Sequence, residues 1–84
     1  MKNKFLVEIK VPEVNKKFDI YLPINKKIGN VIILLNKAIA DLTNGEYQGS
    51  NKTVLYNKIT GSKYDINLLV RETDIKHGSS LILL

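Results

Sequence analysis

The sequence predicts an α+β fold in which a small mixed sheet of four or five strands carries one packed helix. Residues 5–22 alternate between apolar and polar side chains with the period of two that half-buried strands show. Residues 28–42 change to the period of a helix, and residues 53–84 return to short apolar runs separated by turn residues. We expect a single domain over residues 1–84, because so short a chain has room for one hydrophobic core.

Residues 5–11 and 18–22 are the first two expected strands. The odd-numbered positions of the first strand are apolar and should face the core, whereas Leu6 and the charged residues between them should face outward. In the second strand the even-numbered positions should face inward. Pro12 and the polar residues after it supply a turn, so the two strands should form an antiparallel hairpin. Pro23 lacks an amide hydrogen and should end the second strand.

Residues 28–42 are expected to form the helix and to pack one apolar stripe on the sheet. Asn44 and Gly45 should end it, because both residues tolerate the left-handed conformation that a helix end often needs. The stripe follows the helical spacing of three and four residues. It consists of Ile28, Val31, Ile32, Leu35, Ala38, Ile39 and Leu42.

Residues 53–57, 63–65 and 81–84 are the remaining expected strands, the middle one brief. A glycine turn at residues 60–62 separates the first two. Residues 66–74 connect to the last strand, and the side chain of Ile75 should be buried in the hydrophobic core. A terminal segment frays unless a neighbouring element holds it. We therefore expect the last strand to pair inside the sheet, at its centre.

This order of strand, strand, helix, strand, short strand, strand is that of the ubiquitin-like β-grasp fold, whose last strand lies beside its first. The second half of the chain resembles the corresponding stretch of ubiquitin. The resemblance is carried by Val54-Leu55-Tyr56 before a glycine turn, by Leu69-Val70 and by residues 74–83. The ending resembles, more specifically, the YukD/EsaB family, the small ubiquitin-like proteins of bacterial type VII (WXG100, Esx) secretion systems. Its motif is Asp74-Ile75-x-x-Gly78-x-x-Leu81-x-Leu83-Leu84.

The resemblance implies a cytoplasmic accessory component that supports export of WXG100-type substrates by binding other proteins of the machinery. It brings no catalytic residue and no cofactor. A ubiquitin-like modifier or a sulfur carrier is the alternative in another class. Conjugated relatives end in a flexible Gly-Gly, whereas Leu84 stands here at the end of a strand. We therefore expect that the domain is not conjugated.

The amino-acid composition limits which kinds of functional site and partner we expect. The chain has no cysteine and one histidine, so a disulfide, a thiolate nucleophile or a metal site is not expected, and we expect no enzyme. The apolar runs are too short to span a bilayer, so we expect no direct membrane insertion. The net charge is +5, but Arg71 is the one arginine and the lysines are dispersed. We therefore do not expect nucleic acid as a partner, and a weak nucleic-acid-binding domain is a second alternative.

Two surfaces are candidates for protein binding. If Leu81 and Leu83 face the core, alternation sends Ile82 and Leu84 to the open face of the sheet, as it does Leu6. By resemblance to ubiquitin, Leu55 is also outward and Leu84 matches a member of ubiquitin's binding patch. The first candidate surface is therefore Leu6, Leu55, Ile82 and Leu84, flanked by Lys10, Tyr21 and His77. The alternative is that these residues are the ordinary apolar surface of a small sheet.

The second candidate surface lies on the back of the helix. Ile33 falls about 160° from the centre of the core stripe at 100° per residue, and Leu34 falls on its flank. With Lys37 they could contact a second copy of the chain or a secretion protein, so a monomer or a weak homo-oligomer is expected. The alternative is that Ile33 is a single exposed apolar residue or is covered by the loop at residues 45–52.

Overall fold

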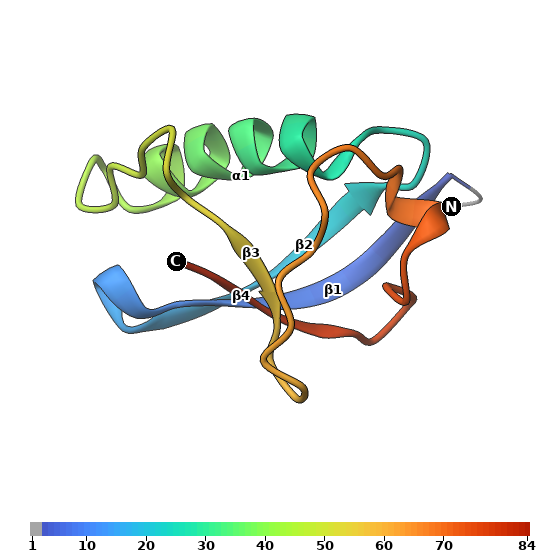
Figure 1. The fold of residues 1–84 in the computed structure, drawn as a ribbon. Coiled ribbons are helices and arrows are strands. Elements are labelled where there is room, and N and C mark those ends of the chain that lie inside the picture. Colours follow the sequence, from blue (N-terminus) through green and yellow to red (C-terminus); the bar gives the residue numbers. More distant parts are fainter. Residues whose placement is uncertain (1–2) are drawn as a thin grey trace.

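The computed structural model describes residues 3–84 as a four-stranded sheet with one α-helix across one of its faces (Figure 1). The strand order is β2-β1-β4-β3, with β4 parallel to β1 and the other neighbours antiparallel. This mixed sheet confirms the predicted α+β fold. The elements are β1 (Lys4–Val11), β2 (Lys16–Pro23), α1 (Ile28–Leu42), β3 (Leu55–Asn57) and β4 (Ser80–Leu83), with single 3₁₀ turns at Pro12–Val14 and Val70–Glu72.

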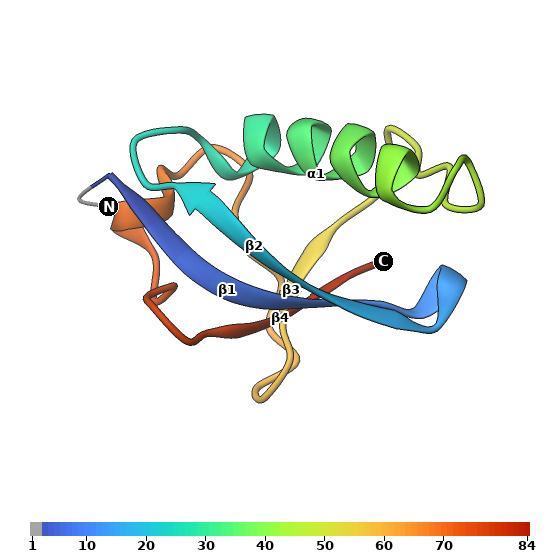
Figure 2. The same cartoon turned by 180° about the vertical axis from the view of Figure 1, so that it is seen from behind.

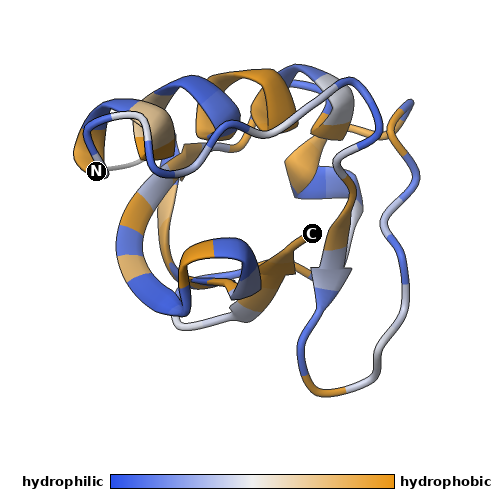
Figure 3. Cartoon of the chain, turned by 90° about the vertical axis from the view of Figure 1, so that its left-hand side faces the viewer, coloured by the Kyte–Doolittle hydropathy of each residue, from blue (hydrophilic) through white to orange (hydrophobic). Residues whose placement is uncertain are grey.

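The hairpin of β1 and β2 forms as the alternation predicts. Its register places Leu6 opposite Tyr21 and Ile9 opposite Phe18. The odd-numbered residues of β1 face α1, and Val7, Ile9 and Val11 are fully buried. Figure 3 shows apolar and polar residues alternating along the strands, which is the pattern of a sheet with one buried face.

The last strand lies in the middle of the sheet, as expected. In the parallel pair, Ile9 lies beside Leu81 and Lys10 beside Ile82. Ile9, Leu81 and Leu83 are all buried under α1. The two central strands therefore come from the two ends of the described chain, and the hydrophobic core forms between them and the helix.

The helix covers the sheet with Ile28, Val31, Ile32, Leu35 and Ile39, while Ala38 is half-buried. The prediction that Leu42 belongs to this stripe is wrong, because its side chain is 62% exposed. Thr43 is buried there in its place. Its Oγ1 donates to the carbonyl of Ile39 at 2.7 Å and accepts the N–H of Tyr47 at 3.0 Å.

The helix ends where the sequence predicts. Asn44 and Gly45 both have positive φ, of 53° and 83°. The N–H of Gly45 donates back to the carbonyl of Ala40 at 2.8 Å, which satisfies a carbonyl that the helix end leaves free. Tyr47 then fills the core space beyond the last turn, since its side chain is buried.

The predicted brief strand at residues 63–65 is instead a single bridge between Tyr56 and Lys63. The side chain of Tyr64 is buried, and its hydroxyl donates to the carboxylate of the exposed Asp74 at 2.7 Å. Ile75 is buried in the core, as predicted, and Val70 is buried as well. The sheet of the described residues therefore has four strands.

Leu55→Ala tests the packing of the sheet. Leu55 is fully buried, so truncation should lower the free energy of unfolding by about 2–5 kcal/mol, as large-to-small core substitutions do. Ile59→Ala is the matched control, because Ile59 is 86% exposed and its truncation should change the free energy by less than about 0.5 kcal/mol. Urea unfolding followed by circular dichroism measures both. Equal effects of the two substitutions would contradict this packing.

Tyr64 should make the fold sensitive to alkali. Burial, and then the hydrogen bond to Asp74, raise the pKa of Tyr64 above its usual value. The unfolded chain therefore loses the phenol proton first, and stability that is complete below about pH 10 should fall as the pH rises above it. Tyr64→Phe should lower stability by about 1 kcal/mol near neutral pH but flatten this alkaline decline.

Urea unfolding of both proteins at about pH 8 and about pH 11 measures the effect. Tyr47 should leave some decline in the variant, because burial raises the pKa of Tyr47 as well. An identical loss of stability in the two proteins between these pH values would show that Tyr64 is not the group responsible.

Candidate protein-binding surface

The face of the sheet that points away from α1 is the open face. Strand alternation and register define which side chains it carries. Leu6 stands opposite Tyr21 near one end, and Ile82 stands between Lys10 and Tyr56 further along. Leu6 and Tyr21 are exposed, while Ile82 and Tyr56 are half-buried. The structure therefore confirms the outward positions of Leu6 and Ile82.

The structure nevertheless does not bring Leu6 and Ile82 together. Lys10 is the β1 neighbour of Ile82, so Leu6 lies four residues back along the strand, or about 13 Å at 3.3 Å per residue. A polar row crosses the sheet between them. Glu8 lies beside Ser80 in this row, and Lys58 places its Nζ 3.9 Å from the Glu8 carboxylate. The predicted single surface is thus two apolar areas separated by an ion pair.

The prediction that Leu55 faces outward is wrong. Leu55 is 0% exposed because it stands opposite Leu83, whose side chain is turned into the core. Tyr56 takes the outward position and lies opposite Ile82. A shift of one residue moves every side chain of a strand to the other face. The run Val54-Leu55-Tyr56 is apolar throughout, so alternation within it could not fix the register, and only its pairing with β4 does.

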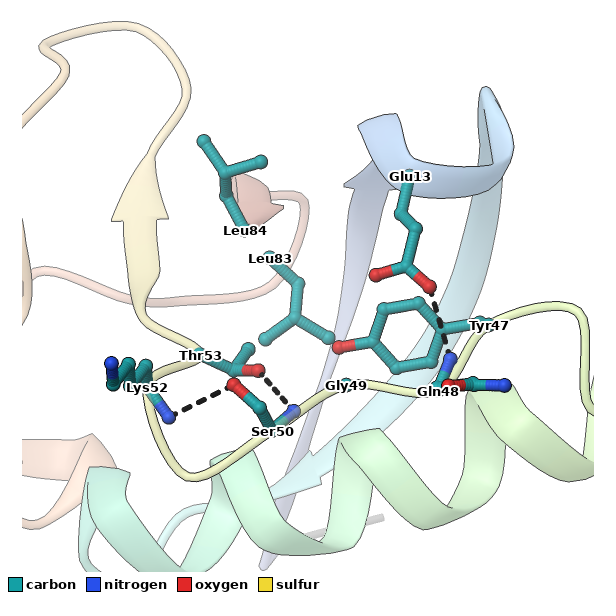
Figure 4. Close-up of a pocket in the computed structure, with 9 residues that line it drawn as sticks. All are labelled: Glu13, Tyr47, Gln48, Gly49, Ser50, Lys52, Thr53, Leu83 and Leu84. Carbon is teal, nitrogen blue, oxygen red and sulfur yellow. Dashed lines mark hydrogen bonds between the residues drawn. The ribbon is translucent and has the colours of Figure 1, made fainter.

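The larger apolar area continues from Ile82 toward the end of β4. Backbone hydrogen bonds of 2.8 and 3.0 Å join Val54 and Leu84 in both directions and extend the pairing of β3 with β4 by one step. Leu84 is 64% exposed. In Figure 4 the side chain of Leu83 points toward Tyr47, whereas that of Leu84 points the opposite way. We call this area the Ile82 patch; it consists of Val54, Tyr56, Ile82 and Leu84.

His77, expected at the flank of the binding surface, has a structural role in the fold. Its Nδ1 accepts the N–H of Leu6 at 2.9 Å, and its ring meets Phe5 edge-on at a centroid distance of 5.3 Å. The N–H of Gly78 donates to the carbonyl of Leu6 at 2.9 Å. The turn before β4 therefore provides hydrogen-bond partners for the backbone N–H and carbonyl of Leu6. Strand β4 does not pair with Leu6, because its pairing with β1 begins at Glu8.

Ile33 and Leu34 are exposed on the helix, by 67% and 48%. The alternative that the loop after the helix covers Ile33 is therefore wrong. The two side chains border different hollows: Ile33 lines one of about 400 Å³ with Asn36 and Ile66, and Leu34 lines one of about 330 Å³ beside β2. The structure thus does not join Ile33 and Leu34 into one concave surface.

A further hollow of about 380 Å³ lies beside the end of β4, and Figure 4 shows its lining. Two of the polar side chains that line it accept hydrogen bonds from the backbone. The carboxylate of Glu13 accepts the N–H of Gln48 at 3.0 Å, and Thr53 Oγ1 accepts the N–H of Ser50 at 2.9 Å. The first bond joins the loop between the helix and β3 to the hairpin turn, and the second lies within that loop. Leu84, a member of the Ile82 patch, borders this hollow.

Within residues 3–84, no helix has the length and the apolar run needed to cross a membrane. The same part of the chain contains no group of three or more histidine, aspartate and glutamate side chains placed to hold a metal ion.

The fold can be compared with those of known proteins. No protein-family model matches the chain, and no curated protein matches its sequence. Solved structures do match, and they define the class: the chain has the ubiquitin-like fold, which confirms the predicted β-grasp architecture.

The neighbours include domains of secretion proteins. The ubiquitin-like domain of EccD5 from Mycobacterium xenopi is 20% identical, with a TM-score of 0.78 over 96% of this chain and 92% of that domain. The ubiquitin-like domain of the Mycobacterium tuberculosis type VII secretion protein EccD1 is 12% identical, with a TM-score of 0.73 over 96% and 97%. A chain of an ESX-5 inner membrane complex is 14% identical, with a TM-score of 0.71 over 98% of this chain.

The present chain spans 21% of that ESX-5 chain, so this likeness concerns one part of a longer protein. All three identities are low, and the likeness shows the fold alone. Membership of the YukD/EsaB family stays a prediction.

His77→Ala tests the structural role of the histidine. Removing the ring leaves the N–H of Leu6 without its protein partner, so the free energy of unfolding should fall by about 1 kcal/mol. Lys76→Ala is the control in the same turn; its exposed side chain should contribute within about 0.5 kcal/mol. Thermal unfolding measures both. A His77→Ala protein as stable as the control would contradict this role.

Proposed function

We propose that this domain is a protein-binding module without catalytic activity, and that it serves a type VII (WXG100/Esx) secretion system on the cytoplasmic side. It acts through noncovalent contacts of the Ile82 patch. The observation that carries the proposal is this patch itself, an apolar area on the sheet face opposite α1, in which Leu84 is exposed and Val54, Tyr56 and Ile82 are half-buried.

The surroundings of the Ile82 patch suit a protein partner. Lys10 borders it on β1, and the Glu8–Lys58 ion pair lies at its next row. An apolar centre inside a charged, solvated rim is the usual composition of a protein–protein interface. Tyr56 adds an aromatic ring with a hydroxyl group, a side chain that often contributes strongly to such interfaces.

Two observations support the assignment to secretion. The ending of the sequence resembles the YukD/EsaB family, and ubiquitin-like domains of type VII secretion proteins are among the structural neighbours. Because the first likeness is a short sequence pattern and the second concerns the fold alone, the partner is proposed by class only, as a protein of the secretion machinery.

Complementation of a deletion strain tests the proposal. The organism that makes this protein is deleted for its gene, and export of a WXG100 protein into the medium is measured with each variant. Leu84→Asp places a charge in the patch, and Ile82→Thr removes apolar area while keeping a β-branched residue in the strand. Both should reduce export by about tenfold, because apolar contacts with the partner are lost.

Ile59→Asp is the matched control, since Ile59 is highly exposed and lies outside the patch. It should support export at the level of the unchanged protein. Circular dichroism verifies that each variant is folded. Normal export in the deletion strain would refute the secretion role, whereas full complementation by the two folded patch variants would refute the role of the Ile82 patch.

A further inference from the structure

The open face of the sheet carries two adjacent rows of charge. In one row Asp19 lies opposite Glu8, and in the next row Lys17 lies opposite Lys10. These are the outward positions of β1 and β2, since the residues between them pack in or against the core. Figure 2 shows α1 above β1 and β2, so both rows point away from the helix.

Both rows continue across β4 and β3. In the parallel pair, Ser80 lies beside Glu8 and Ile82 lies beside Lys10. The N–H of Lys58 donates to the carbonyl of Ser80 at 3.0 Å, which continues the pairing of β3 with β4 by one step. We name the rows after their β1 residues. The Glu8 row is Asp19, Glu8, Ser80 and Lys58, and the Lys10 row is Lys17, Lys10, Ile82 and Tyr56.

The charges on β1 and β2 are not neutralised within one copy of the chain. Like charges stand directly opposite each other in each row, an arrangement that is unfavourable in a sheet. Glu8 has Lys58 at 3.9 Å. Within residues 3–84, Asp19, Lys10 and Lys17 form no ion pair. This face therefore presents carboxylates and ammonium groups that an added molecule can pair.

The two rows are complementary to each other, and so to a second copy of the same face. A two-fold axis can run parallel to the rows and midway between them, in the plane between two stacked sheets. This axis lays each strand over the same strand of the second copy and exchanges the rows. Glu8 then faces Lys10 of the second copy, and Asp19 faces Lys17 of the second copy. An isologous contact needs such a patch, because each copy must supply both halves of it.

The other positions of the rows suit the same arrangement. Ser80 faces Ile82 of the second copy, and Lys58 faces Tyr56 of the second copy. A lysine over an aromatic ring is a favourable cation–π pair. No position in either row meets a like charge, so the whole width of the face is compatible with a second copy.

The net charge of +5 on each copy opposes self-association. At about 0.15 M salt the Debye length is about 8 Å, so lysines elsewhere on the surface are screened, whereas charges in direct contact are not. The rows span four strands about 4.8 Å apart, so the contact is roughly 20 Å wide. Contacts that bury less than about 1,200 Å² in total are typical of transient complexes. The charges and the size together predict a weak, reversible contact.

We propose that two copies of this chain associate face to face through the Glu8 row and the Lys10 row. The complex is a weak symmetric dimer in which rows of opposite charge pair across the two-fold axis. It covers Ile82 and Tyr56, so a protein partner of the Ile82 patch competes with the second copy. Self-association itself needs no secretion protein and is independent of the proposed function.

Dilution of the whole chain, followed by NMR, tests the dimer. Amide chemical shifts are measured from about 1 mM to about 20 µM protein at about 0.15 M salt, a range that reveals a weak dissociation constant. The shifts of Glu8, Lys10, Lys17 and Asp19 should change with concentration, and those of α1 should stay constant. The rotational correlation time should rise at the high concentrations.

Charge reversal on the edge strand β2 tests the predicted pairing. Asp19→Lys and Lys17→Asp each place like charges at both symmetric contacts, and each should weaken self-association at least about tenfold. The double variant restores opposite charges and keeps the net charge, so its dissociation constant should return to within about threefold of that of the unchanged protein. An equimolar mixture of the two single variants should associate as well as the double variant.

Lys37→Asp is the matched control. Lys37 is exposed on α1, on the other side of the sheet, and its reversal lowers the net charge by as much as Lys17→Asp does. It should leave the dissociation constant within about threefold of that of the unchanged protein. Circular dichroism verifies that each variant is folded.

Several outcomes would overturn the proposal. One is a set of shifts that stays constant over the whole concentration range. Another is a folded double variant that associates as weakly as the single variants, and a third is an equal effect of Lys37→Asp and Lys17→Asp. Concentration-dependent shifts centred on Ile33 would assign self-association to the helix instead. Asp19 and Lys17 lie outside the Ile82 patch, and no measurement here depends on WXG100 export, so the dimer and the secretion role can fail independently.

Discussion

The parallel pairing of β1 with β4 is the contact on which the rest of the structure depends. It places Ile9 beside Leu81 in the middle of the sheet and buries both under α1. Each of the two strands then has one further neighbour, β2 on one side and β3 on the other. Because these strands lie far apart in the sequence, the pairing closes a long loop, and its entropy cost must be offset by the burial of the apolar core.

The same pairing determines which side chains the protein displays. Once Leu81 and Leu83 face the helix, Ile82 must face outward, and the register with β3 brings Tyr56 opposite it. The Ile82 patch is therefore a direct consequence of how the core is packed. The hollow beside β2 has another origin, since α1 covers the centre of the sheet and leaves Leu34 exposed over the edge strand.

Much of this structure could be predicted from sequence because the signals were local. The alternation around Val7 and the helical stripe around Leu35 each fix a face, and Asn44-Gly45 marks the end of the helix. Leu55 could not be placed, because its face depends on a partner strand and not on its neighbours in sequence. The predicted burial of Leu42 was wrong for a related reason. The buried side chains of Thr43 and Tyr47 occupy the position expected for Leu42, and the helical spacing of apolar residues does not predict this tertiary packing.

Native-state hydrogen exchange on the amides of β1 and β4 tests the central role of this pairing most directly. The N–H of Glu8, which donates to the carbonyl of Ser79 at 3.0 Å, and the amides at the centre of β4 should exchange only through global unfolding. Their exchange free energies should equal the free energy of unfolding measured with urea. If β4 instead exchanged by a local opening at clearly lower free energy, while the hairpin of β1 and β2 stayed protected, the pairing of β1 with β4 could not be the contact that holds the fold together.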